Sequence, residues 1–306
     1  MTRRTLLFRA LRLVLTVLVA AIAIFCMVRL SGDPTQILAG PDATPERVAQ
    51  MRAQWGLDDP MHVQLWSFLI NAVQGDFGHS ITIGMPASEL FLARLPATLL
   101  LGLASLGISL LVGLPLGILA ALKHNSALDR LVMSLAVFAF SMPNFFLGVL
   151  FILLFSLQLH WLPSFGSGTA LHLVMPALTL GLSGSGAIAR FSRSSMLDVL
   201  NQPYVMAARA RGVPMLRRTV LHALPNALIP LVTIIGMRLG DLIAGAIVVE
   251  TVFAWPGIGR LLAESVSSRD LAVVQVIVLA TSVTMVTANF LVDMLYGWLD
   301  PRVKQS

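Results

Sequence analysis

The chain has 306 residues, of which 57% are hydrophobic and only 12% are charged, and its formal net charge is +6. Soluble domains carry about a quarter charged residues, so this composition excludes an ordinary soluble protein and indicates a membrane protein. The basic residues lie in short stretches beside apolar runs, which argues against nucleic acid as a partner.

Six apolar segments are long enough to cross a membrane, which takes about 20 residues. In chain order they are 9–30, 97–122, 131–157, 171–189, 226–249 and 271–296. The fourth contains Pro176 and several glycines, which close packing against partner helices can accommodate. The single cysteine, Cys26, lies in the first segment, which lacks the small-residue pattern of a cleavage site and is therefore expected to be retained.

The lysines and arginines predict the orientation of these segments. They gather in the N-terminal tail, around 123–130 and 190–218, and at the C-terminus. With six spans, all of these stretches fall on one side, which the positive-inside rule makes cytoplasmic. Residues 31–95 fall on the other side, carry more acidic than basic residues, and contain two expected helices at 44–55 and 63–73. We predict an all-α polytopic protein with both termini inside and a small helical external insert between the first two spans.

A polar stretch between the fourth and fifth spans is not composed like a simple loop. Pro203 can open a helix, because a first-turn residue needs no N–H. Gly212 is placed to end that helix in a left-handed cap, and Pro214 can start a second helix. Pro225 is expected to introduce the next span. The sequence therefore predicts two short helices joined at a glycine elbow, forming a compact docking surface on the cytoplasmic side.

The spacing in this stretch resembles the coupling loop of ATP-binding-cassette (ABC) importer permeases, which opens Glu-Ala-Ala and closes Ile-x-Leu-Pro. Here Met206 stands where that family has the Glu, and His222 stands where it has the Ile. The run from Ala208 to Gly212, with its alternating arginines, is typical of the peptide/nickel subgroup of these permeases. Further segments similar to that subgroup are Gly75-Asp-Phe-Gly-His-Ser80, Arg94-Leu-Pro-Ala-Thr98, Ser141-Met-Pro-Asn-Phe-Phe-Leu-Gly148, the stretch 249–260, and Trp298-Leu-Asp-Pro-Arg302.

The resemblance implies a type I ABC importer permease-like fold in a bacterial cytoplasmic (inner) membrane. It divides the chain into 1–30, the N-terminal tail and first span; 31–95, the external insert; and 96–306, a permease core of five spans with a cytoplasmic coupling loop at 190–225. The residues expected to contact the ATPase are Tyr204, Ala207, Ala208, Arg209, Ala210, Arg211, Gly212, Leu224 and Pro225.

The resemblance also implies the partners. They are a second homologous permease subunit, two ATP-binding subunits and an external solute-binding protein, with membrane lipid around the spans. The sequence has no Gly-x4-Gly-Lys-Ser/Thr phosphate loop, so ATP and Mg would be bound by the partner subunits and this chain is expected to hold no cofactor and to catalyse no reaction. Its histidines are scattered singly, so no metal site is expected.

Two further features are candidates for a role in transport, namely the segment 250–260 and a pair of charged residues in the fifth span. The apolar segment 250–260 is either a tight external loop with an interfacial tryptophan or, as the resemblance implies, a gate beside the pathway mouth. Its gate candidates are Glu250, Phe253, Trp255, Pro256, Gly257 and Gly259. Arg238 and Asp241 lie three residues apart near the middle of the fifth span, where charged groups are costly and face a bundle interior or a wet cavity. They are either a packing pair or part of the pathway.

These observations favour the permease subunit of an ATP-driven importer of short peptides, with nickel chelates, glutathione and opine-like compounds as other ligands of the subgroup. An ion-coupled secondary transporter using Arg238 and Asp241 is the main alternative, and it would leave the docking loop unexplained. An intramembrane enzyme is a weaker alternative, because the sequence offers no nucleophile or metal constellation.

Overall fold

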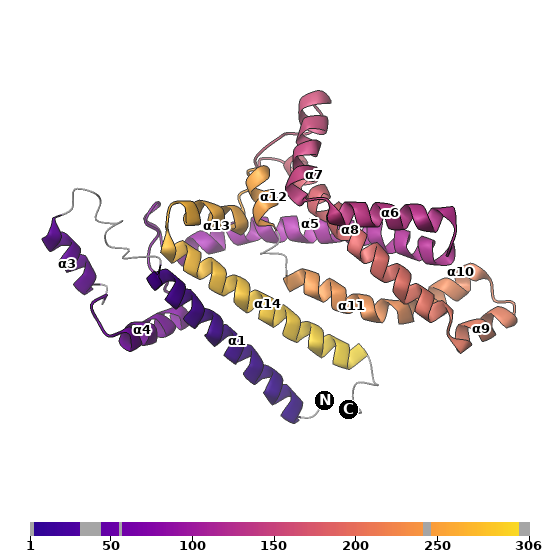
Figure 1. Ribbon diagram of the computed structural model, residues 1–306, viewed down its shortest axis with the longest axis horizontal. Helices are drawn as coiled ribbons and strands as arrows, with labels where there is room; N and C mark the ends of the chain where they lie inside the picture. The colour runs from indigo at the N-terminus through magenta and orange to yellow at the C-terminus, as the bar shows by residue number, and fades with distance from the viewer. Residues whose placement is uncertain (1–2, 31–43, 55–56, 241–245, 300–306) are drawn as a thin grey trace. The chain divides into compact units, whose positions relative to one another are not determined.

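The computed structural model describes residues 3–30, 44–54, 57–240 and 246–299 (Figure 1). These residues are mainly helical, and they show no β pairing beyond one isolated bridge between His79 and Pro86. They form two compact units. One is built mainly from Ala97–Arg260 and Thr287–Ser306, and the other from Thr2–Pro96 and Leu261–Val286. The second unit therefore combines the N-terminal region, which includes the predicted insert, with a segment from near the C-terminus.

The N-terminal unit contains α1 (Arg3–Leu30), α3 (Pro45–Gln54) and α4 (Met61–Gln74). It also holds the start of α5 (Ala87–Leu122), most of α13 (Ile258–Ser267) and the first half of α14 (Leu271–Leu299). The two helices expected at 44–55 and 63–73 are confirmed as α3 and α4. In its core, Ala21 and Ile24 of α1 pack with Leu279 of α14 and with Phe68 of α4.

The other unit is organised around α8 (Leu171–Leu200), which packs against α6 (Ala127–Ser141), α7 (Asn144–Phe151) and α11 (Leu224–Gly240). Glycines allow this close packing. A Cβ on Gly117 of α5 would overlap the carbonyl oxygen of Ala189, and a Cβ on Gly186 of α8 would overlap that of Ala136. The glycines of the fourth span therefore act as packing residues, as the sequence indicates.

Five described helices are long and apolar enough to cross a membrane, and the bent pair of α6 with α7 and η1 (Ile152–Gln158) gives a sixth if it counts as one span. The apolar segment at 131–157 is present as two helices rather than one, and the pair bends by 99° at Met142 and Pro143. Proline restricts the residue before it to extended backbone, and Met142 has φ −73° and ψ 128°. Figure 1 shows α7 leaving the end of α6 in a different direction.

The prediction that Pro225 introduces the fifth span is wrong. The helix begins with α10 (Met215–Arg217) and passes through the π-helical η2 (Arg218–Ala223) directly into α11, so Pro225 lies inside it. Proline cannot donate the hydrogen bond that an α-helical turn requires, and a π-helical segment is one of the ways a helix accommodates such a defect. The polar stretch is therefore the cytoplasmic beginning of the fifth span rather than a separate second helix.

Candidate functional site

The elbow of the candidate coupling loop has the geometry that its glycine predicts. Helix α9 (Pro203–Ala210) begins with proline in its first turn and ends at Arg211. Gly212 follows with φ +77°, and its N–H donates to the Arg209 carbonyl at 3.0 Å. The Val213 N–H donates to the Ala208 carbonyl at 3.1 Å, which completes a Schellman cap. A Cβ on Gly212 would meet nothing within 4 Å, so only the backbone conformation demands glycine there.

Helix α9 is fixed to the beginning of the fifth span by a polar contact and a small core. The Tyr204 hydroxyl donates to the His222 carbonyl at 3.4 Å, and the Asn226 amide donates to the Tyr204 hydroxyl at 2.9 Å and to the His222 carbonyl at 3.0 Å. Val205 is 2% exposed and Thr219 is 5% exposed. These contacts tie the start of α9 to the fifth span.

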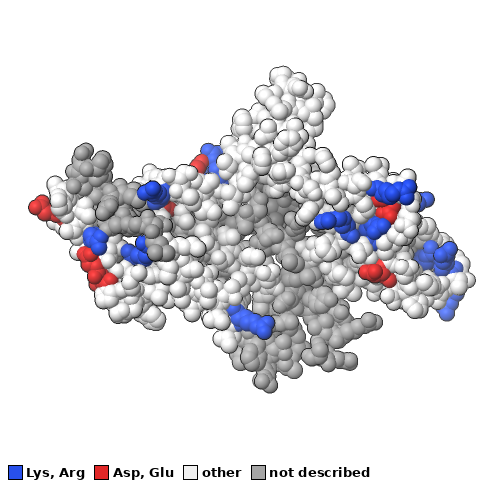
Figure 2. Space-filling view, viewed as in Figure 1, with Lys and Arg blue, Asp and Glu red and all other residues white. Residues whose placement is uncertain are grey.

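The outer face of this loop is exposed and mixes apolar and basic groups. Met206 is 54% exposed and Leu216 is 78% exposed. Arg209, Arg211 and Arg217 are exposed as well. Figure 2 shows basic side chains gathered over α9 and α10. Exposed apolar side chains among cations suit a protein partner with an apolar groove and acidic groups.

The remaining predicted coupling residues are divided between the exposed face and the packed interior. Ala207 and Ala210 are exposed and Ala208 is half-buried on α9. Leu224 packs against a buried cluster that contains Met196 of α8. Leu224 is therefore a residue that anchors the surface, and it is not part of the exposed face.

The gate candidates form a tightly bonded loop after α12 (Ile247–Val252). Glu250 is fully buried, and its Oε1 accepts a hydrogen bond from the Thr98 hydroxyl at 2.7 Å. Its Oε2 accepts one from the Arg260 N–H at 3.0 Å. The same Thr98 oxygen accepts from the Ile258 N–H at 2.7 Å. Glu250 lies beyond the predicted fifth span, and burial raises the pKa of its carboxyl, opposed by the hydrogen bonds from Thr98, Arg260 and Gly259.

Aromatic side chains close this loop from both sides. Trp255 is 4% exposed, and its indole N–H donates to the Ala97 carbonyl at 2.9 Å. Phe253 is 2% exposed and packs against Met175 of α8. A Cβ on Gly257 would overlap the Glu250 carboxylate, which explains the need for glycine there. Gly259 is buried and Pro256 is half-buried. The loop is held in place by buried hydrogen bonds to one carboxylate. This construction fits both a tight external loop and a gate beside the pathway mouth.

The pathway candidates fall at the limit of the described residues. The backbone of Arg238 belongs to α11, but its side chain is not described, and Asp241 lies outside the described residues. Whether this pair packs or lines the pathway therefore stays a prediction.

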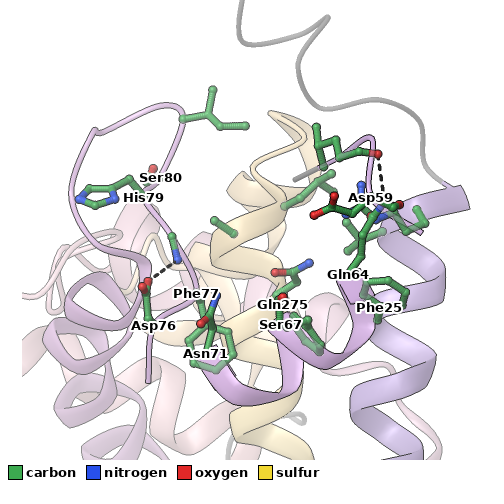
Figure 3. A pocket seen from close by; sticks show the side chains of 18 residues that line it. Phe25, Asp59, Gln64, Ser67, Asn71, Asp76, Phe77, His79, Ser80 and Gln275 are labelled. Carbon is green, nitrogen blue, oxygen red and sulfur yellow. Dashed lines mark hydrogen bonds between the residues drawn. The ribbon is translucent and has the colours of Figure 1, made fainter. Parts of the chain in front are cut away.

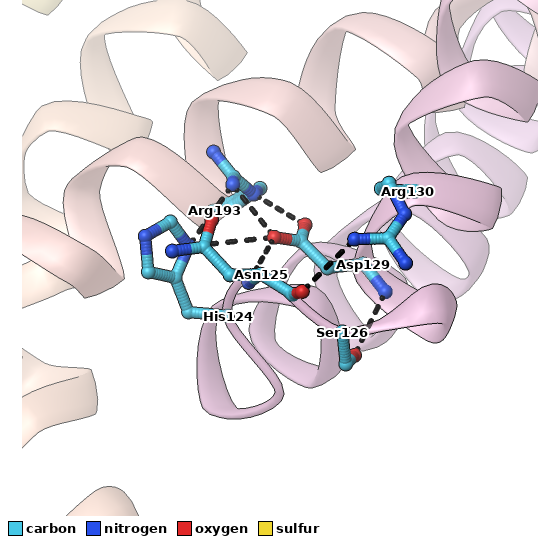
Figure 4. A network of polar contacts seen from close by, with 6 residues as sticks. All are labelled: His124, Asn125, Ser126, Asp129, Arg130 and Arg193. Carbon is cyan, nitrogen blue, oxygen red and sulfur yellow. Dashed lines mark hydrogen bonds and ion pairs between the residues drawn. The ribbon is translucent and has the colours of Figure 1, made fainter.

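A buried ionic network that no sequence motif indicates lies at the turn between α5 and α6 (Figure 4). Asp129 is 3% exposed and accepts two hydrogen bonds from Arg193 of α8, at 2.6 and 2.7 Å. The Asn125 N–H donates to the same carboxylate at 2.9 Å, and His124 contacts the Arg193 guanidinium at 3.1 Å. A bidentate arginine–carboxylate pair fixes orientation as well as distance. It anchors the α5–α6 turn to the helix that leads into α9.

Comparison with known proteins decides the family. Residues 113–305 match the family described as "Binding-protein-dependent transport system inner membrane component". Residues 1–101 match the N-terminal component of the same kind of membrane protein. The chain belongs to this family. It is a multi-pass protein of the bacterial inner membrane and a permease subunit of an ABC importer, and it has the type I importer permease fold.

Relatives match nearly the whole chain. The glutathione transport system permease protein GsiC of Salmonella typhimurium strain LT2 is 43% identical over 297 residues, which is 97% of each chain. The GsiC protein of Escherichia coli strain K12 is 41% identical over the same share. Among solved structures, the inward-facing MetNI methionine ABC transporter aligns with a TM-score of 0.56 at 21% identity, covering 69% of this chain and 96% of that chain. An amino acid ABC transporter with histidines aligns with a TM-score of 0.53 at 19% identity, covering 69% of this chain and 94% of that one.

Proposed function

We propose that this importer permease forms half of a translocation pathway for short peptides, with glutathione as the first solute to test. The observation that carries the proposal is the identity of 41–43% to glutathione permeases across 97% of both chains. Glutathione is a tripeptide, so it belongs to the short-peptide class that the subgroup motifs indicate. A second homologous permease supplies the other half of the pathway, and an external solute-binding protein delivers the solute.

The energy comes from two ATP-binding subunits that dock on the exposed face of α9 and α10. ATP and Mg are bound by those subunits, so this chain contributes no catalytic group. The geometry supports this division of labour, because Tyr204 and Val205 fix α9 to the fifth span. Closure of the ATPase pair would then displace the span together with the coupling helix.

The loop 250–260 acts as the external gate element in this proposal. Its support is the buried Glu250 carboxylate, which holds the loop at Thr98 on α5 and at the Arg260 backbone. A gate needs an element that moves as one piece, and the hydrogen bonds of Glu250 hold this loop together in that way. Arg238 and Asp241 are the pathway residues proposed to contact the charged ends of a passing peptide.

The solute is tested by reconstituting the chain with its neighbouring permease, ATPases and binding protein in liposomes. Uptake of radiolabelled glutathione and of radiolabelled Ala-Ala is measured with ATP enclosed in the liposome lumen, on the side of the membrane where the ATPases lie. The proposal expects ATP-dependent accumulation of at least one of the two peptides. Accumulation of neither peptide, while a nickel chelate is imported under the same conditions, would show that the solute class is wrong.

A further inference from the structure

A cavity of about 580 Å³ lies inside the N-terminal unit, apart from the candidate sites above. Its walls come from α1, from α4, from the loop 76–81 and from the start of α14 (Figure 3). The apolar part of the wall includes three aromatic side chains, Phe25, Phe68 and Phe77, together with aliphatic ones such as Val28 and Ile81. Cavities that hold small organic ligands measure about 300–1,000 Å³ and combine apolar walls with a few converging polar groups. Both properties are present here.

One face of α4 is lined with uncharged polar side chains. Gln64, Ser67 and Asn71 follow each other at helical spacing, and Gln275 joins them from α14. Figure 3 shows these side chains on the cavity wall. Among the described residues, the side chains of Ser67, Asn71 and Gln275 have no hydrogen-bond partner. Amide groups that both donate and accept match the main-chain groups of a peptide.

Gln64 adds a buried acceptor to this face. Its amide nitrogen donates to the carbonyl oxygens of Leu57 at 2.9 Å and Asp59 at 2.6 Å, which settles which amide atom is the nitrogen. Its Oε1 is buried and accepts no hydrogen bond from the described residues. Buried acceptors in native proteins are normally satisfied. This oxygen therefore calls for an N–H donor.

The charged groups of the lining suit a ligand with both signs of charge. Arg29 lies with its guanidinium 5.5 Å from the Phe25 ring centroid, and Asp59 and Asp76 also line the cavity. Asp76 is engaged locally, because its carboxylate accepts the Gly78 N–H at 2.9 Å. One arginine faces two aspartates in this lining, and this balance disfavours a purely anionic ligand such as a phosphate or an anionic lipid headgroup.

We propose that this cavity binds a short zwitterionic peptide, with the amide face of α4 and Gln275 pairing with its main chain. Arg29 attracts its carboxylate and Asp59 its ammonium group. The inference deepens the proposed function, since it assigns to the insert region a binding site for the same class of solute. The site is a property of the N-terminal unit alone and requires no ATP and no partner.

The test is equilibrium binding of radiolabelled Ala-Ala to the purified full-length chain in phosphatidylcholine nanodiscs, without ATP or binding protein. Asn71→Leu and Gln275→Leu remove side chains that have no hydrogen-bond partner among the described residues, so neither substitution breaks a described contact. Each is expected to raise the Kd at least about tenfold, which corresponds to about 1.4 kcal/mol. Gln74→Leu is the matched control, because Gln74 is exposed on the same helix but does not line the cavity. It should leave the Kd within about twofold.

Two further arms separate the ligand chemistries. N-acetyl-Ala-Ala-amide, which lacks both charged ends, should bind the wild-type chain more weakly than Ala-Ala does. Its Kd for Asp59→Asn should nearly equal its Kd for the wild-type chain, because it has no ammonium group for Asp59 to attract. Equal Kd values for Asn71→Leu, Gln275→Leu and Gln74→Leu would overturn the proposal. So would displacement of Ala-Ala by phosphatidylglycerol in the wild-type nanodiscs but not in Asn71→Leu, because the cavity would then be a lipid site. The measurement needs no transport, so its failure is distinct from a failure of uptake in the full importer.

Discussion

Thr98 and Glu250 lie 152 residues apart in the chain and are joined by a buried hydrogen bond of 2.7 Å. The Thr98 hydroxyl donates to the carboxylate and accepts the N–H of Ile258 at 2.7 Å, so one oxygen ties α5 to both ends of the external loop. The loop therefore depends on a side chain that lies on a different span.

The first prediction concerns this hydroxyl. Thr98→Val keeps the shape of the side chain but leaves Glu250 Oε1 and the Ile258 N–H without this partner, which should lower the free energy of unfolding by about 1–3 kcal/mol. Thr98→Ser keeps the hydroxyl and is the control. Thermal unfolding of the purified variants in detergent measures the effect. A valine variant as stable as the serine variant would mean that the bridge does not hold the loop.

The second prediction concerns pH. Burial raises the pKa of Glu250 above its ordinary value of 4.5. The folded state then holds the proton more tightly than the unfolded state. The stabilising contribution of protonation is therefore full below the ordinary pKa and is lost as pH rises through the raised, folded-state pKa. As the pH rises from about 4.5 through the raised pKa, wild type should lose unfolding free energy relative to Glu250→Gln. Parallel stability curves for the two proteins would contradict this expectation.

The third prediction concerns coupling at the elbow. Gly212 has φ +77°, so Gly212→Val introduces strain of about 1–3 kcal/mol without any steric contact. ATP-driven uptake should fall by at least about tenfold while the amount of protein in the membrane changes little. Gly84→Val is a matched control, since Gly84 has φ +75° and equally open surroundings in the other unit. If both valine variants reduce uptake equally, the effect is general strain and not loss of coupling.

The fourth prediction concerns orientation. In a Cys26→Ser background, single cysteines replace Gln202 beside α9 and Ser167 in the loop before α8, both of which are exposed. A membrane-impermeant thiol reagent applied to the periplasmic side should label only the Ser167 variant, because the positive-inside rule places the arginine-rich loop in the cytoplasm. Labelling of the Gln202 variant from outside would reverse the topology.

The local features of this protein could be predicted from its sequence, and the long-range ones could not. The cap at Gly212 depends on a few neighbouring residues, and the structure has it as expected. The bend at Pro143 has a local cause, the proline itself. The long apolar run around the proline nevertheless favours a single span. Pro225 is also a local signal of a defect in the helix, because proline cannot donate the hydrogen bond of an α-helical turn, but the proline alone does not indicate that the defect takes the form of a π-helical turn.

The side-chain pairings depend on how distant helices pack. Asp129 and Arg193 are 64 residues apart, and nothing in the spacing of either residue indicates the other. The cavity beside α4 is similar, because its walls come from both ends of the chain. The polar positions of α4 form an ordinary amphipathic pattern, and nothing in their spacing indicates that Gln275 of α14 lines the same cavity.

We propose that this chain carries its solute through the membrane with energy from ATP and not from an ion gradient. The most direct measurement is accumulation of labelled glutathione or Ala-Ala by proteoliposomes that contain the full importer and its binding protein, with ATP and with an imposed proton or sodium gradient supplied separately. We expect accumulation with ATP alone, none with either gradient alone, and loss of the ATP-driven signal in Gly212→Val. Accumulation driven by an ion gradient without ATP, and abolished by Asp241→Asn, would contradict this proposal and establish the ion-coupled alternative.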